Sequence, residues 1–312
     1  MRKIVYFILQ ASISIFLVNL VFDEVGDYAL ELAFSDNFLL DFSQAVFLFL
    51  LGLLMQTWRL FFFVSIYDQR ISKFLLFTAQ YLGTFFSLIL PSSIGGDFVK
   101  VLILKNGLNG FTRATVPIVM DRLVGLLSIT FFIPVYFLVL GNFSFHLIYL
   151  YLIFGTLFMV ATVFLIFLLF QKFYKKYSFT LGKFLPSNFK FLELLIIFTL
   201  SLFSQILIFV SLWIATKSIN FQSNLLDFVG ASSLAITLSS IPISIGGWGM
   251  RELIFANMME ALSYSYGLAI QAGFVLGLLP LLACSPSLLL FFFIERIAVN
   301  QKLEANKDRI KK

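Results

Sequence analysis

Two stretches of the sequence are nearly copies of each other: LPSSIGGDFVK at residues 90–100 and IPISIGGWGMRE at residues 241–252. Each places a proline, which interrupts a helix, and a pair of glycines between strongly apolar runs. The aligned positions are Pro91 with Pro242, Ser93 with Ser244, Gly95 with Gly246, Gly96 with Gly247, and the cation Lys100 with Arg251. Such internal similarity indicates that two parts of the chain share one architecture.

The composition is typical of an integral membrane protein. Hydrophobic residues make up 60% of the chain and charged residues only 12%, at a mean hydropathy of +1.00, far from the values of soluble domains. The single cysteine, Cys284, excludes an internal disulfide and a cysteine-cluster metal site. The single histidine, His146, leaves no histidine-based zinc or triad chemistry. We therefore expect neither a metal nor a cofactor.

Apolar segments long enough to cross a bilayer occur along the whole chain. A hydrocarbon core of about 30 Å needs about 20 apolar residues in a helix. Six segments qualify, and two shorter runs end at the two Pro-Gly stretches. The six are 4–22, 42–64, 114–140, 146–170, 191–215 and 268–294, and the shorter two are 74–90 and 225–241. No polar linker separates a soluble domain, so we predict one all-α membrane domain over residues 1–312.

Lysine and arginine in short loops predict the orientation, because such loops stay in the cytoplasm. Arg2 and Lys3 place the N-terminus there. If 74–90 simply crossed the membrane, the cations that follow it would lie outside. These cations are Lys100, Lys105 and Arg113. The conflict disappears if the chain turns at residues 91–96, which makes 74–106 a re-entrant hairpin that begins and ends inside.

The second short run predicts a matching hairpin from the opposite face. Residues 225–262 would begin and end outside, and 268–294 would bring the basic tail into the cytoplasm. The two halves, about 42–140 and 191–294, would then form an inverted repeat. Irregular backbone within a bilayer must be covered by protein or water, so both tips should lie buried near the midplane. We expect a multi-pass protein of the plasma or inner membrane with both termini in the cytoplasm.

The paired stretches also suggest a binding site. Broken apolar segments at corresponding places in two halves of a membrane protein point to a transport site. If a helix restarts after each glycine pair, its free N–H groups and the following cation, Lys100 or Arg251, would bind an anion such as a lipid phosphate. The alternative is that the glycines only permit tight helix packing and the prolines only kink the chain. Trp248, inside the second stretch, would line the pathway.

Several charged residues lie where the bilayer centre is expected. A charge there costs about 2.5–3.5 kcal/mol on insertion scales, so these residues should face protein or a polar cavity. They are Asp97, Lys100, Asp121, Arg122, Arg251 and Glu252. Acidic and basic residues are balanced in this set, which suggests a network of ion pairs. The alternative is that these ion pairs only fix the packing of the helices. Arg59, near the inner end of its span, either joins this network or extends to the interface.

The motifs of enzymes are missing from the sequence. There is no carboxylate pair at metal-binding spacing, no nucleotide-phosphate loop, no nucleophile elbow, and no histidine partner for a nucleophile. Each of the acidic candidates has a basic neighbour in the sequence that explains it better than catalysis does. We therefore assign no catalytic residue.

Four separated pieces of the chain resemble the transmembrane flippase-like domain of lysylphosphatidylglycerol synthases. These are Arg59, LPSSIGGDFVK, MDRLVGL at residues 120–126 and PISIGGWGMRE, in the expected order. The resemblance covers nearly the whole chain and implies a membrane protein that moves a polar lipid between leaflets. The polar positions it implies are Arg59, Asp97, Lys100, Asp121, Arg122, Arg251 and Glu252. Relatives often have arginine where this chain has Lys100, which keeps the charge but loses a bidentate phosphate contact.

The leading functional hypothesis is therefore a lipid flippase, with the head group passing between the hairpin tips. The expected ligand is a membrane lipid with an anionic or phosphate head group, and no nucleic acid. Whether the head group is also aminoacylated or glycosylated stays open. The resemblance does not extend to an aminoacyl-transfer domain, so lysyl transfer is not expected. Two alternatives stay open: a membrane transferase acting on lipids or polyprenyl-phosphate sugars, and an accessory subunit of a lipid-modifying enzyme. Association with a second copy or with such an enzyme also stays open.

Overall fold

The computed structural model describes Ser12 and residues 35–65, 71–90, 93–108, 110–140, 191–241 and 243–290. Within these ranges the chain is helical and contains no strand, which confirms the all-α fold class. Among the described helices, four are long and apolar enough to span a membrane. They are α2 (Phe38–Ser65), α5 (Phe111–Leu140), α7 (Phe191–Lys217) and α10 (Tyr266–Cys284). The protein is therefore a multi-pass membrane protein.

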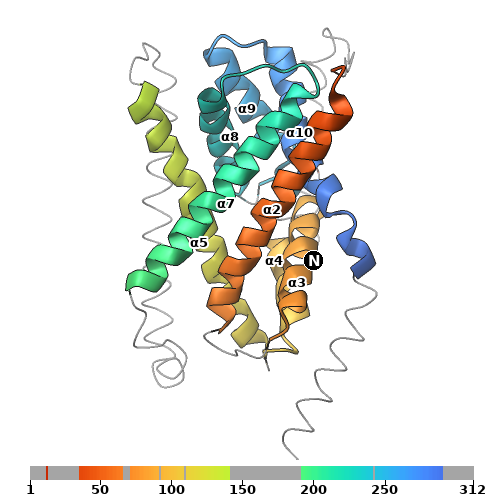
Figure 1. The fold of residues 1–312 in the computed structure, drawn as a ribbon, viewed down its shortest axis with the longest axis vertical. Helices are drawn as coiled ribbons and strands as arrows, with labels where there is room; N and C mark the ends of the chain where they lie inside the picture. The colour runs from red at the N-terminus through yellow and green to blue at the C-terminus, as the bar shows by residue number, and fades with distance from the viewer. Residues whose placement is uncertain are drawn as a thin grey trace, which may run out of the picture.

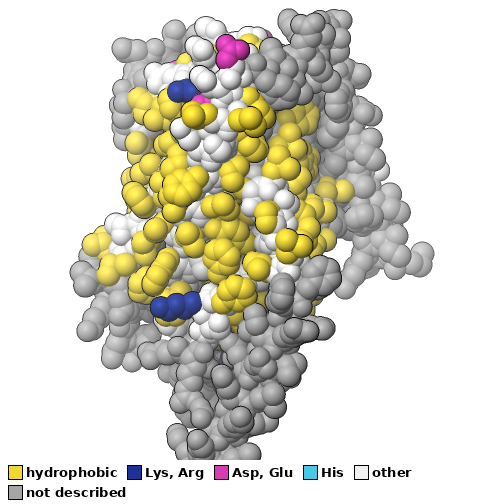
Figure 2. Space-filling model, turned by 45° about the vertical axis from the view of Figure 1, so that its right-hand side comes forward, with side chains coloured by type: hydrophobic (Ala, Val, Ile, Leu, Met, Phe, Trp, Pro, Cys, Tyr) yellow, Lys and Arg dark blue, Asp and Glu magenta, His cyan; other side chains and the backbone are white. Residues whose placement is uncertain are grey.

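These four helices agree with the predicted spans 42–64, 114–140, 191–215 and 268–294. The other two predicted spans, 4–22 and 146–170, lie outside the described residues. In Figure 1, α2 and α7 run side by side at a slant through most of the height of the described helices. Figure 2 shows a face on which hydrophobic side chains cover the middle, with charged side chains towards its two ends, as expected for a protein in a bilayer.

Small residues allow α2 and α7 to approach closely, as is common between helices in membranes. A Cβ on Gly52 of α2 would lie 2.8 Å from the Ile208 side chain of α7. The Ser211 hydroxyl of α7 donates to the Ala45 carbonyl of α2 at 2.6 Å. Since lipid supplies no hydrophobic drive between helices, these close contacts and the interhelical hydrogen bond hold the pair together.

Each of the two short apolar runs forms the first helix of a helical hairpin. The first consists of α3 (Lys73–Ile89) and α4 (Ser93–Leu104), packed against each other. The second consists of α8 (Leu225–Ser239), the short 3-10 helix η1 (Ile245–Gly247) and α9 (Met250–Ala261). Figure 1 shows α3 and α4 in the lower half of the molecule and α8 and α9 in the upper half. The two hairpins therefore lie towards opposite ends of the molecule, whereas the inverted repeat stays a prediction.

The two hairpins differ in where the second helix begins. The anion site considered in the sequence analysis requires a helix that restarts after each glycine pair. This holds for α9, which begins at Met250, but α4 already begins at Ser93, so that Gly95 and Gly96 lie within its first turns. The second stretch has a third glycine, Gly249, with a φ of 83°, whereas Phe98 stands at the aligned position. A phenylalanine strongly disfavours that backbone conformation, so the first stretch does not support the same turn.

Candidate functional site

The tips of the two hairpins touch each other in the middle of the molecule. Trp248, directly after η1, donates from Nε1 to the carbonyl oxygen of Leu88 near the end of α3, at 3.0 Å. Gly246 lies against the same peptide, and a Cβ at this position would come within 2.7 Å of the Leu88 carbonyl carbon. Its φ of 59° adds a second reason for glycine here. The tips are thus in direct contact rather than separated by an open passage.

In the first hairpin the glycines serve close helix packing. A Cβ on Gly96 would overlap the Gly83 carbonyl oxygen of α3 and lie 2.7 Å from the Ser87 side chain. Gly83 in turn admits the side chain of Lys100, because a Cβ there would lie 2.5 Å from the Lys100 Cε. The packing of α4 on α3 therefore holds the Lys100 side chain in the protein interior.

Asp97 connects this buried lysine to α5. Its carboxylate forms an ion pair with Arg122 through Oδ2, and its Oδ1 lies 3.7 Å from the Lys100 Nζ. Lys100 is only 8% exposed, whereas the side chains of Asp97 and Arg122 are 18% and 25% exposed. Among the described residues, Asp97 is the one carboxylate within ion-pair distance of Lys100, and it is shared with Arg122. The positive charge of this buried lysine is therefore only partly neutralised by Asp97.

A second ion pair joins α2 to α5 and is fully enclosed. Arg59 Nε donates to Asp121 Oδ1 at 2.6 Å, and the two side chains are 3% and 4% exposed. The guanidinium also donates to the Ser201 hydroxyl of α7 at 2.5 Å, and Ser201 donates to Ser128 of α5 at 2.7 Å. Gly125 makes room for the arginine, since a Cβ there would lie 3.2 Å from Nη2. Arg59 thus belongs to the interior network and does not extend to the interface.

The third ion pair lies at the start of α9. Arg251 Nη2 lies 2.5 Å from Glu252 Oε1, and the other oxygen of this carboxylate accepts the Gly249 N–H at 2.6 Å. Arg251 packs against the Trp248 ring at 4.8 Å and against Gly277 of α10, where a Cβ would come within 2.6 Å of Cζ. Glu252 is completely buried. Its carboxylate therefore occupies the N-terminal turn of α9, the position where the sequence analysis expected a ligand anion.

The helix α5 is bonded to both hairpins. Arg122, about three turns into α5, pairs with Asp97 of α4, and near the end of α5 the Tyr136 hydroxyl donates to Asp227 Oδ1 of α8 at 3.0 Å. The other Asp227 oxygen accepts the Tyr264 hydroxyl at 2.9 Å. A Cβ on Gly230 would lie 2.6 Å from the Tyr136 ring, so α5 and α8 are also in close contact.

The structure shows where most of the predicted site residues lie. It places the seven charged positions in three groups, Asp97–Lys100–Arg122, Arg59–Asp121 and Arg251–Glu252. Pro91 and Pro242 lie outside the described residues, and of Ser93 only the backbone is described. Ser244 is 2% exposed, and its hydroxyl has no hydrogen-bond partner among the described groups. Gly247 has a φ of 80°, which explains its identity.

Other residues of the site carried no signal in the sequence. Ser201 and Ser128 extend the Arg59 group, and the glycines that face the buried cations are Gly83, Gly125 and Gly277. Serine and glycine are common in membrane helices, so only the spatial neighbours reveal their roles. The Leu88 carbonyl oxygen accepts a hydrogen bond from Trp248. The sequence could not single it out as an acceptor, because every residue has a backbone carbonyl.

The fold and the site together define a polytopic membrane protein with two opposed helical hairpins and charged groups buried around their tips. Residues 7–297 match the family described as the lysylphosphatidylglycerol synthase TM region. The chain belongs to this family, which associates it with membrane lipids. No curated protein and no solved structure matches the chain.

Proposed function

We propose that the protein is a lipid translocase that moves the polar head group of an anionic lipid between leaflets while the acyl chains stay in the bilayer. In this proposal the two hairpins are the halves of an inverted repeat, and the protein acts in the cell membrane with both termini in the cytoplasm. It performs no covalent chemistry on the lipid. Family membership supports the link to lipids, and the opposed entry of the hairpins supports the inverted repeat.

The observation that carries the proposal is the environment of Lys100. A lysine whose side chain is 10% exposed within the membrane needs a counter-charge, and Asp97 supplies only a contact of 3.7 Å while it also pairs with Arg122. A lipid phosphate would supply the missing negative charge. The partial exposure of Asp97 and Arg122 gives such a group a way to reach the cluster.

The second hairpin suggests how an empty site is kept neutral. The Glu252 carboxylate binds the Arg251 guanidinium and the first turn of α9, which together would also bind a phosphate. A phosphate arriving there has to displace the Glu252 carboxylate. Because Trp248 and Gly246 contact Leu88 directly, the tips must also part before a head group can pass. The described arrangement thus corresponds to a closed state of the transporter.

The proposal is tested by measuring the transfer of a fluorescent anionic lipid between leaflets of proteoliposomes. We expect Lys100→Gln and Asp97→Asn to abolish transfer, and Lys100→Arg to retain it. For the second tip, the pair Arg251→Met with Glu252→Gln avoids an isolated buried charge and should also abolish transfer. Asp36→Asn is the control, because Asp36 is exposed and lies outside the three groups.

Two results would refute the assignment. One is unchanged transfer in both Lys100→Gln and the double variant, provided that both elute as folded protein. The other is a change in the mass of the lipid after incubation, because a translocase alters the leaflet of a lipid and a transferase alters its structure.

A further inference from the structure

A pocket between α2 and α3 lies apart from the three charged groups. It has a volume of about 320 Å³, near the lower end of the range of about 300–1,000 Å³ that is typical of ligand pockets. It lies between the last turns of α2 and the first turns of α3, in the lower half of the molecule as Figure 1 shows it. The lining residues are Leu54, Thr57, Trp58, Phe61, Lys73, Phe74, Leu76 and Phe77.

The lining is apolar except at one end. Leu76 and Thr57 are buried, and the Thr57 hydroxyl donates within α2 to the Leu53 carbonyl. Trp58 and Phe74 are 47% and 44% exposed, so the pocket opens on the outer surface of these helices. In a bilayer this surface faces hydrocarbon, from which water is excluded. An apolar hollow there is most stably filled by an acyl chain.

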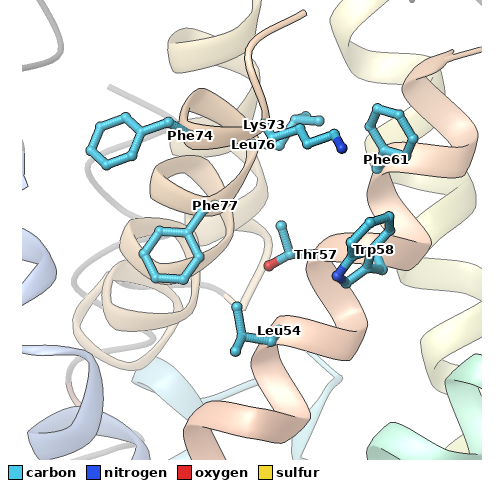
Figure 3. A pocket seen from close by; sticks show the side chains of 8 residues that line it. All are labelled: Leu54, Thr57, Trp58, Phe61, Lys73, Phe74, Leu76 and Phe77. Atoms are coloured by element: carbon cyan, nitrogen blue, oxygen red, sulfur yellow. The ribbon is translucent and has the colours of Figure 1, made fainter.

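The Lys73 ammonium is the one charged group of the lining. Figure 3 shows its side chain reaching from the start of α3 towards α2. Its Nζ lies 5.3 Å from the centre of the Trp58 ring and 5.7 Å from that of Phe61, which are cation–π distances. No carboxylate among the described residues lies within ion-pair distance of it. Within the described ranges, the ammonium at the end of this apolar hollow is therefore not neutralised by a carboxylate.

We propose that this pocket binds one acyl chain of an anionic phospholipid from the adjacent leaflet, with the lipid phosphate on the Lys73 ammonium. The apolar lining matches the chain, and the lysine at its end matches the negative head group. Lys73 is also the first residue of α3, whose positive dipole end adds to the attraction. The site is separate from the Lys100 cluster, and the proposal does not depend on lipid transfer.

Trp58 provides a direct probe, because bromine atoms on an acyl chain quench tryptophan fluorescence at short range. The protein is reconstituted in zwitterionic lipid with increasing fractions of brominated phosphatidylglycerol or brominated phosphatidylcholine. The part of the quenching that Trp58→Phe removes is assigned to the pocket. We expect this part to saturate at a lower fraction of the anionic lipid than of the zwitterionic lipid.

A variant of Lys73 tests how much this lysine contributes to the preference for anionic lipid. One lysine near a membrane surface contributes an attraction that corresponds to about a fivefold preference for anionic lipid, and Lys73→Gln should remove it. Lys217→Gln is the matched control. Lys217 lies 3.3 Å from the centre of the Trp213 ring at the end of α7, in the upper part of Figure 1, so it combines a lysine with a tryptophan away from this pocket.

Two outcomes would overturn the proposal. Equal quenching of Trp58 by both brominated lipids would show contact with bulk lipid only, or a pocket filled by another part of the chain. A preference for the anionic lipid that survives in Lys73→Gln would assign the selectivity to another group. A transfer assay on the same vesicles tests the translocase separately, so failure of one proposal is distinguishable from failure of the other.

Discussion

Replacing Asp121 with asparagine would leave the Arg59 guanidinium enclosed without its counter-charge. The two side chains are 3% and 4% exposed, so water does not screen the change. Removing one partner of such a buried pair costs about 3–5 kcal/mol of folding free energy. Asparagine keeps the shape and one acceptor oxygen, and the bond from Arg59 to Ser201 can persist. We therefore expect a loss near the lower value, about 3 kcal/mol.

The assay is reversible unfolding in detergent, followed by tryptophan fluorescence and circular dichroism. Asp36→Asn is the control, because it removes an exposed carboxylate and should change the free energy of unfolding by less than about 0.5 kcal/mol. The double variant Arg59→Met with Asp121→Leu removes both charges at similar volume. It should be more stable than Asp121→Asn, because an apolar pair in place of a buried ion pair is often neutral or stabilising.

Two results would contradict this account of the pair. Equal stability of Asp121→Asn and Asp36→Asn would mean that Arg59 reaches water or another acid in the folded protein. A double variant as unstable as the single one would mean that the loss comes from packing rather than from the isolated charge.

Three further predictions concern other contacts of the described helices. Gly277→Ala should destabilise the protein by about 1–3 kcal/mol in the same unfolding assay, because the methyl group collides with the Arg251 guanidinium; unchanged stability would contradict this packing. Trp248→Phe should cost about 0.5–1.5 kcal/mol through the lost bond to the other hairpin and increase hydrogen exchange at the tips, and unchanged exchange would argue against this contact. Burial raises the pKa of the Tyr264 phenol above its ordinary value of 10.0, and its bond to Asp227 adds to this shift. The associated stability is therefore fully present below about pH 10 and lost as the pH rises further, so Tyr264→Phe should flatten the alkaline decline of the unfolding midpoint.

The hairpins could be predicted from the sequence because two signals agreed on them. The prolines and glycines broke the apolar runs, and the cations after the first break could not be placed outside the membrane. The start of α4 could not be predicted in the same way. The similarity of the two stretches suggested that their backbones are equal. The second stretch has Gly249, whose positive φ precedes the start of α9, but the first stretch has Phe98 at the aligned position and does not support this conformation.

The charged residues were predictable as a set, but their pairing was not. Asp121 and Arg122 are neighbours in the sequence and carry opposite charges, which suggested a local relation. Consecutive residues of an α-helix project about 100° apart, so Asp121 meets Arg59 of α2 while Arg122 meets Asp97 of α4. Packing between distant segments decides which helix lies on which side of α5. Local patterns in a single sequence do not reveal this arrangement.

The bonds of α5 to α4 towards its middle and to α8 near its C-terminal end have a mechanical consequence. If the first hairpin shifts and keeps its Asp97–Arg122 pair, it must pull α5 with it. The displacement of α5 then acts on the Tyr136–Asp227 bond to the second hairpin. The two hairpins are thus coupled through α5, and a movement of one of them changes the contacts of the other.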